Sequence, residues 1–97
     1  MDKQIILEKL KACAEEIRRL FRVKRLSVFG SIARGEASEN SDIDVLVAFE
    51  QRASFDGFME LKFYLEELLG TEVDLVTEKA LRPEVRQAIE KEKIDVS

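Results

Sequence analysis

The sequence predicts an α/β fold in which helices alternate with the strands of a small mixed sheet. Two kinds of apolar pattern alternate along the 97 residues. Long stretches with apolar residues three or four positions apart predict amphipathic helices, and short runs rich in β-branched and aromatic residues predict strands. The predicted order is α-β-α-β-α-β-α. We expect one domain over residues 1–97, because a chain of this length has no room for a second core.

The first predicted helix runs near residues 3–20. Its apolar stripe consists of Ile6, Leu10, Cys13, Ile17 and Leu20. A stripe of this kind faces the core of a globular domain. Because Cys13 lies within the stripe, we expect it to be a core residue and not a nucleophile.

Two strands and a short helix follow. "RLSVFG" (25–30) predicts a strand that ends at Gly30, and Ser31 to Arg34 predicts a short helix closed by Gly35. "ASENS" (37–41) is rich in turn formers and predicts a loop. "DIDVLVAF" (42–49) predicts the second strand. Its continuous apolar run indicates burial on both faces, so helices should cover the sheet.

The second half of the chain predicts a helix, a strand and a final helix. Phe58, Leu61, Leu65 and Leu68 form the stripe of a helix over 55–69 that stops at Gly70. "TEVDLVT" (71–77) predicts the third strand. Pro83 marks the first turn of the last helix, with Val85, Ala88 and Ile89 facing inward. Several apolar residues of 55–64 exceed what one stripe needs. We favour core positions for them, some against the last helix, and the alternative is a surface for a partner: Phe55, Phe58, Met59, Phe63 and Tyr64.

Composition and charge restrict the function. The chain has no histidine and one cysteine, which excludes an internal disulfide and the usual zinc sites. Its net charge of −4 provides no overall basic footprint, so we expect no direct binding to nucleic acid. "RRLFRVKR" (18–25) favours a solvated helix end over a patch that attracts phosphates or an acidic partner. A charged N-terminus and the lack of long apolar runs predict no membrane association and a cytoplasmic location.

Asp42 and Asp44 are the first candidate site residues. Two residues apart on a strand, they point to the same face, with α-carbons roughly 6–7 Å apart. Two carboxylates held together repel each other, and a divalent cation such as Mg²⁺ would neutralise them. The alternative is that both are solvated residues at a strand start, although aspartate is a poor strand former.

Gly30, Ser31 and Arg34 are candidates for phosphate binding. A strand that ends in glycine and continues into a helix exposes backbone N–H groups, and Ser31 can donate its hydroxyl to a phosphate oxygen. The alternative for Ser31 is an ordinary N-cap. Arg34 lies on the same helical face as Ser31, where it either pairs with a phosphate or is solvated.

The position of Asp74 links these groups. If Gly30 and Asp42 serve one site, the first two strands are antiparallel neighbours. If Asp74 joins them, the third strand is parallel to the second, reached through a right-handed crossover. The predicted sheet therefore has three strands in the order 1-2-3, with a phosphate turn and three carboxylates at one edge. The alternative for Asp74 is a solvated edge position.

These residues carry a resemblance to a known family. "GSIARGEASENSDID" fits the pattern Gly-Ser, ten residues, Asp-x-Asp, which resembles the signature of the polymerase-beta-like nucleotidyltransferase superfamily. "ARGEA", "VDLVT" and "LRP" resemble the minimal nucleotidyltransferases, the antitoxins of HEPN/MNT toxin–antitoxin pairs. The resemblance extends from about Leu26 to Ile89. It implies transfer of AMP from ATP to a tyrosine hydroxyl of a HEPN toxin, which silences the toxin.

The resemblance also implies roles for the site residues. Asp42 and Asp44 would hold two Mg²⁺ ions, and Asp74 would bind one of them and orient or deprotonate the attacking hydroxyl. Gly30 and Ser31, with help from Arg34, would hold the β- and γ-phosphates of the nucleoside triphosphate. Two other functions stay open: an antitoxin that neutralises its toxin by binding alone, and an enzyme that modifies a small molecule such as an antibiotic. The sequence leaves open whether the chain assembles with copies of itself or with a toxin.

Overall fold

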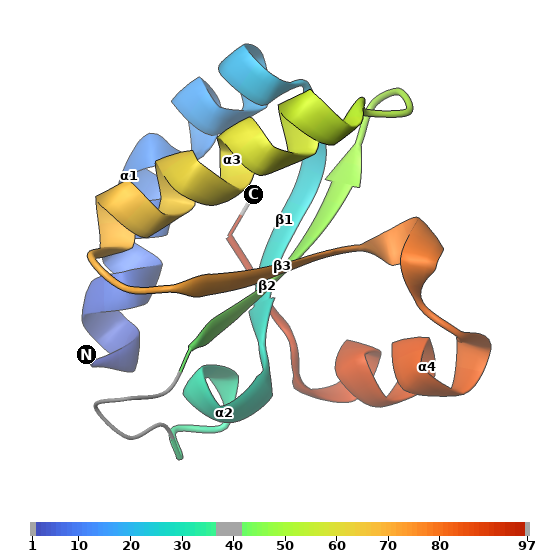
Figure 1. The fold of residues 1–97 in the computed structure, drawn as a ribbon. Helices are drawn as coiled ribbons and strands as arrows, with labels where there is room; N and C mark the ends of the chain where they lie inside the picture. Colours follow the sequence, from blue (N-terminus) through green and yellow to red (C-terminus); the bar gives the residue numbers. More distant parts are fainter. Residues whose placement is uncertain (1, 37–41, 97) are drawn as a thin grey trace.

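The computed structural model describes residues 2–36 and 42–96, and the predicted loop at 37–41 lies outside the described residues. Helices and strands alternate as the sequence predicts (Figure 1). The elements are α1 (Lys3–Phe21), β1 (Val23–Phe29), α2 (Gly30–Ala33), β2 (Ile43–Phe49), α3 (Phe55–Leu69), β3 (Val73–Thr77), a 3₁₀ turn (Glu78–Ala80), α4 (Pro83–Glu92) and β4 (Ile94–Asp95).

The four strands form one mixed sheet in the order β3-β2-β1-β4. β1 is antiparallel to β2, and β2 is parallel to β3, so the predicted order and directions of the first three strands are confirmed. The fourth strand was not predicted. It has two residues, pairs antiparallel to β1 with Ile94 opposite Val28, and is too short to show a sequence periodicity.

Helices α1 and α3 lie together on one side of the sheet, and α4 lies on the other (Figure 1). The main core forms beneath α1 and α3. Its buried members include Ile6, Leu10, Ile17, Leu26, Val28, Val45, Val47, Leu61, Leu65 and Leu69, with Cys13 packed against them as expected. The other face of β2 is only partly covered: Leu46 is buried, but the neighbouring Asp44 and Ala48 are not fully so.

Three predicted core positions of α1 and α4 are exposed. Leu20 is 55% exposed at the end of α1, and Val85 is 43% exposed on α4, where Ala88 is exposed as well. On α4 only Ile89 is buried, because this helix approaches the body of the protein at its C-terminal half. The prediction that Val85 and Ala88 face inward is therefore wrong.

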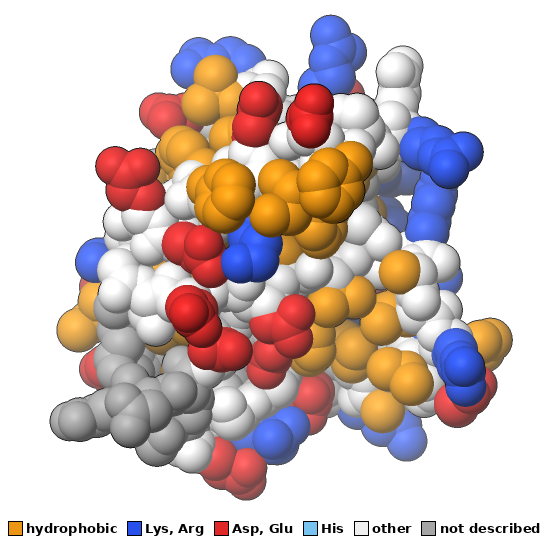
Figure 2. Space-filling model, viewed as in Figure 1, with side chains coloured by type: hydrophobic (Ala, Val, Ile, Leu, Met, Phe, Trp, Pro, Cys, Tyr) orange, Lys and Arg blue, Asp and Glu red, His pale blue; other side chains and the backbone are white. Residues whose placement is uncertain are grey.

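The surplus apolar residues of α3 divide between core and surface. Phe58 and Tyr64 pack against the core, whereas Phe55 and Phe63 are 76% and 57% exposed, so the expectation that all lie in the core is wrong for these two. Figure 2 shows hydrophobic side chains gathered over α3. Phe55 and Phe63 are two helical turns apart and lie on the face of α3 that points away from the sheet.

Local signals fix the ends of the long helices. Asp2 caps α1 by accepting a hydrogen bond from the Gln4 N–H, and Ser54 caps α3 by accepting one from the Gly57 N–H. Gly70 ends α3 in the left-handed conformation, as the sequence predicts. Among the described residues, no helix has the length and apolar character needed to cross a membrane.

Candidate active site

Asp44 and Asp74 are neighbours across the β2–β3 pair. The parallel register places them directly opposite each other. Paired residues of adjacent strands point to the same face of a sheet, so the two side chains lie side by side on the face opposite α1 and α3. The structure thus brings together two of the three predicted carboxylates.

The electrostatics of Asp44 set it apart from an ordinary surface acid. Burial raises the pKa of Asp44, and the negative charges of Asp74 and Asp42 raise it further, whereas the nearby Arg34 guanidinium lowers it. A carboxyl group that is partly buried and faces other carboxylates is costly to ionise. A cation placed between these groups would remove that cost.

Asp42 lies just outside the Asp44–Asp74 pair. It precedes the first paired residue of β2 and is exposed. Its effect on the pKa of Asp44 is smaller than that of Asp74. Within residues 2–36 and 42–96, no group of three acidic, histidine or cysteine side chains is close enough to hold a metal together. Of the three carboxylates predicted to cluster, only Asp44 and Asp74 therefore lie side by side. Strand pairing fixes these two residues, whereas Asp42 precedes the paired part of β2.

Gly30 packs its backbone against the carboxylate of Asp44. A Cβ atom at this position would collide with Asp44 Oδ2 and would lie 2.9 Å from Asp44 Cγ. The φ angle of Gly30 is +74°, in the left-handed region that favours glycine. The strand β1 can therefore turn into α2 beside Asp44 only because residue 30 has no side chain.

Ser31 lies inside α2, one residue after its first position. The N-cap of α2 is Phe29, and no side chain caps this helix. The alternative that Ser31 is an N-cap is therefore wrong. Its backbone oxygen accepts a hydrogen bond of 2.9 Å from the Glu36 N–H, which closes the turn after α2.

Glu92, which the sequence did not single out, joins the site from the end of α4. Its Oε1 accepts a hydrogen bond of 3.1 Å from the Gly30 N–H, and its Oε2 accepts one of 3.0 Å from Arg34 Nη1. Arg34 also donates through Nε to Glu36 at 3.0 Å. Two of the predicted phosphate-binding groups thus already contact a carboxylate. No local pattern marks Glu92, because its partners precede it by 62 and 58 residues.

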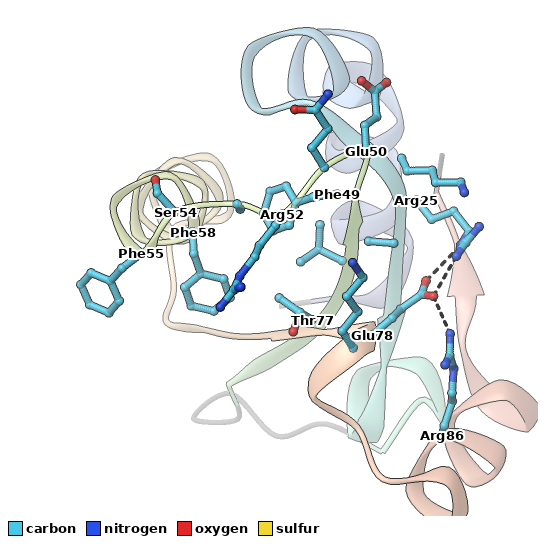
Figure 3. Close-up of a pocket in the computed structure, with 16 residues that line it drawn as sticks. Arg25, Phe49, Glu50, Arg52, Ser54, Phe55, Phe58, Thr77, Glu78 and Arg86 are labelled. Carbon is cyan, nitrogen blue, oxygen red and sulfur yellow. Dashed lines mark hydrogen bonds and ion pairs between the residues drawn. The ribbon is translucent and has the colours of Figure 1, made fainter.

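A cavity of about 590 Å³ lies at the opposite end of the sheet, away from these residues. Its lining comes from the ends of β2 and β3 and the start of α3 (Figure 3). Glu78 borders this cavity, held by Arg25 at 2.9 Å and Arg86 at 3.0 Å. The basic residues of 18–25 do not form one patch. Arg18 and Arg19 lie in the last turn of α1, whereas Arg25 pairs with Glu78.

Comparison with known proteins identifies the family. The nucleotidyltransferase domain family matches residues 10–96, and the chain belongs to this family. A protein adenylyltransferase, MntA, of Thermococcus cleftensis is 45% identical over 87 residues, which cover 90% of this chain and 88% of that protein. The chain thus matches a curated relative over nearly the full length of both.

Solved structures agree with this assignment. A structure described as a minimal nucleotidyltransferase matches with a TM-score of 0.83 and 40% identity, covering 97% of this chain and 95% of that chain. A chain from the complex of a tri-AMPylated HEPN toxin of Shewanella oneidensis with an MNT antitoxin matches with a TM-score of 0.68. Its identity is 18%, with 98% of this chain and 71% of that chain covered, so this second match concerns the fold.

Proposed function

We propose that this nucleotidyltransferase transfers AMP from ATP to a tyrosine hydroxyl of a HEPN toxin and thereby acts as an antitoxin. The observation that carries the proposal is the placement of Asp44 beside Asp74, with the backbone of Gly30 packed against Asp44. The 45% identical relative is a protein adenylyltransferase, which supports a nucleotide donor and a protein acceptor. The MNT antitoxin of similar fold is bound to an AMPylated HEPN toxin.

The donor set fits Mg²⁺. Magnesium is bound through one or two carboxylates, with waters and substrate phosphates completing its shell. Asp44 and Asp74 provide two adjacent carboxylates, and burial together with the charges of Asp74 and Asp42 raises the pKa of Asp44 despite the nearby Arg34. We assign these two residues as ligands, with Asp42 joining them when phosphates are present. Bound Mg²⁺ supplies charge neutralisation at the reacting phosphate.

Other residues of this chain bind the triphosphate and orient the acceptor hydroxyl. The Ser31 hydroxyl and the N–H groups of Arg34 that Glu36 and Glu92 do not take bind the β- and γ-phosphates, while Glu92 holds the Gly30 N–H. Asp74 orients the acceptor hydroxyl and accepts its proton. The acceptor oxygen forms a bond to the α-phosphorus while the bond to pyrophosphate breaks. Positioning and charge neutralisation supply most of the rate enhancement.

A transfer assay tests the proposal. The protein is incubated with ATP labelled at the α-phosphate and Mg²⁺, in parallel with a HEPN toxin and with an antibiotic that carries hydroxyl groups, and the products are examined by gel and mass spectrometry. We expect label and a mass increase of one or more AMP units on a tyrosine of the HEPN protein, and none with the double variant Asp44→Asn/Asp74→Asn. If the double variant still neutralises the toxin, binding alone suffices; if no protein is labelled while an antibiotic is, the acceptor is a small molecule.

A further inference from the structure

Glu92 connects the two groups on which phosphate binding depends. Its carboxylate bridges the Gly30 N–H and the Arg34 guanidinium, with one oxygen for each. The hydrogen bond to the Gly30 N–H is partly buried, whereas the one to Arg34 is exposed. Charge-assisted hydrogen bonds of this kind are shorter and stronger than neutral ones.

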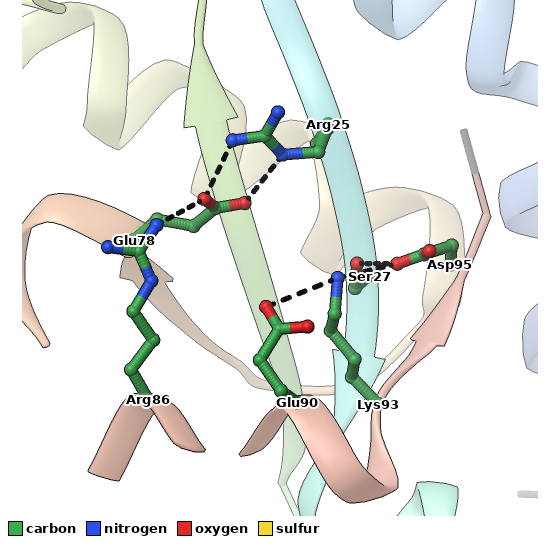
Figure 4. Close-up of polar contacts among 7 residues, drawn as sticks. All are labelled: Arg25, Ser27, Glu78, Arg86, Glu90, Lys93 and Asp95. Carbon is green, nitrogen blue, oxygen red and sulfur yellow. Dashed lines mark hydrogen bonds and ion pairs between the residues drawn. The ribbon is translucent and has the colours of Figure 1, made fainter. Parts of the chain in front are cut away.

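The structure holds Glu92 in place from both sides. At the start of α4, Arg86 pairs with Glu78 at 3.0 Å. After its end, Lys93 pairs with Asp95 at 3.0 Å, and Asp95 accepts a hydrogen bond of 2.6 Å from the Ser27 hydroxyl of β1 (Figure 4). Helix α4 and strand β4 thus fasten Glu92 beside the end of β1, where the Gly30–Ser31 turn begins.

The Gly30–Ser31 turn is consequently held between two carboxylates. Asp44 packs against the Cα of Gly30, and Glu92 binds its N–H. The Arg34 guanidinium is oriented by Glu36 at Nε and by Glu92 at Nη1, and its charge still reaches Asp44. Glu36 and Glu92 take two of the Arg34 N–H groups, so a phosphate would meet the other Arg34 N–H groups and the Ser31 hydroxyl.

We propose that Glu92 is a positioning residue of the nucleotide site: it fixes the Gly30–Ser31 turn and the Arg34 guanidinium in the orientation that receives the triphosphate. The proposal rests on the proposed function, because it concerns the same nucleotide. It predicts that the last helix, which contributes little to the apolar core, is needed for nucleotide affinity.

The test compares Glu92→Ala and Glu92→Gln with Glu90→Gln, a control that removes an acid with a 53% exposed side chain from the same helix. Binding of a non-hydrolysable ATP analogue with Mg²⁺ is measured by calorimetry, and thermal unfolding is recorded for each protein. We expect Glu92→Ala to weaken binding about tenfold or more. Glu92→Gln should lose less, because its amide oxygen still accepts from the Gly30 N–H. Glu90→Gln should bind as the wild type does.

Two results would overturn the proposal. Tighter binding by Glu92→Ala would show that Glu92 competes with the phosphates, and unchanged binding with a lower unfolding temperature would show a role in folding alone. If Glu92→Ala does not fold, equal affinities of Glu92→Gln and the wild type overturn the proposal by themselves. A wild type that binds no analogue would instead refute the proposed function, and the positioning role with it.

In transfer assays, the expected signature of Glu92→Gln is a raised KM for ATP with a smaller change in kcat. A loss confined to kcat would contradict positioning of the triphosphate.

Discussion

Two acidic residues at opposite ends of the sheet, Glu78 and Asp44, have pKa values shifted in opposite directions by their surroundings. Glu78 is 6% exposed and lies between Arg25 and Arg86. The hydrogen bond from Arg25 holds its pKa below the usual range, and both arginine charges add to that effect. Asp44 is half-buried beside Asp74, and burial followed by the charge of Asp74 raises its pKa.

The contrast separates a structural acid from one that we propose to be functional. The fold supplies Glu78 with its counter-charges, so Glu78 stabilises the native state as a carboxylate. It leaves Asp44 with excess negative charge, which costs stability unless a ligand provides a cation. Local conflicts of this kind occur at functional sites and are compensated elsewhere in the fold.

The largest expected effect is on catalysis. Asp44→Asn should lower adenylyl transfer by about 10²–10³-fold or more, because a ligand of the cation that stabilises the transition state is lost. Its unfolding temperature without metal should be unchanged or higher, since one of two repelling carboxylates is removed. Asp56→Asn, an exposed acid of α3, is the control for both measurements. Full activity of Asp44→Asn would remove Asp44 from the site.

Gly30→Ala should damage both stability and activity. The added Cβ would collide with Asp44, and the backbone conformation at φ +74° disfavours alanine. We expect a loss of about 1–3 kcal/mol in the free energy of unfolding, measured by denaturant titration. Gly35→Ala is the matched control, since φ is +73° there and no atom lies within 4 Å of its added Cβ. Equal losses in the two variants would show that contact with Asp44 has no influence.

Glu78→Gln should affect stability without affecting the chemistry. The loss of the charge between two arginines should lower the free energy of unfolding by about 1–3 kcal/mol. At saturating ATP, the transfer rate per folded molecule should be that of the wild type, because Glu78 lies at the other end of the sheet; any loosening of α4 through the lost Arg86 pair should raise only the KM for ATP. Glu84→Gln, an exposed acid of α4, should change neither quantity. A selective loss of activity in Glu78→Gln would place this end of the sheet in the reaction.

Acid titration should show the smallest effect, with opposite signs for the two residues. The stability that Glu78 contributes is present above its ordinary pKa of 4.5 and is lost as the pH falls through its lower folded value. Asp44 destabilises the fold when ionised, and this cost disappears as the pH falls through its raised folded pKa towards the ordinary value of 3.8. Chemical denaturation from pH 7 to 3 of the wild type, Glu78→Gln and Asp44→Asn in metal-free buffer separates the two contributions.

Patterns within short stretches predicted much of this molecule. Apolar periodicity predicted α1 and α3, and Pro83 marked the start of α4. The positions of Gly30, Asp42 and Asp74 in their strands, taken as one site, predicted the directions of β1, β2 and β3. Contacts between distant segments were not predictable in this way. Glu92 meets Gly30, and Ser27 meets Asp95, across more than 60 residues. The exposure of Val85 was equally unpredictable, since an apolar stripe on a helix does not indicate how far that helix lies from the sheet.

Titration of Mg²⁺ into the nucleotide-free protein, followed by calorimetry, tests the central claim that Asp44 and Asp74 together form a cation site. We predict saturable binding by the wild type, a large loss of affinity in both Asp44→Asn and Asp74→Asn, and an unchanged isotherm for Asp56→Asn. Equal Mg²⁺ affinity in the wild type and in Asp74→Asn would contradict it.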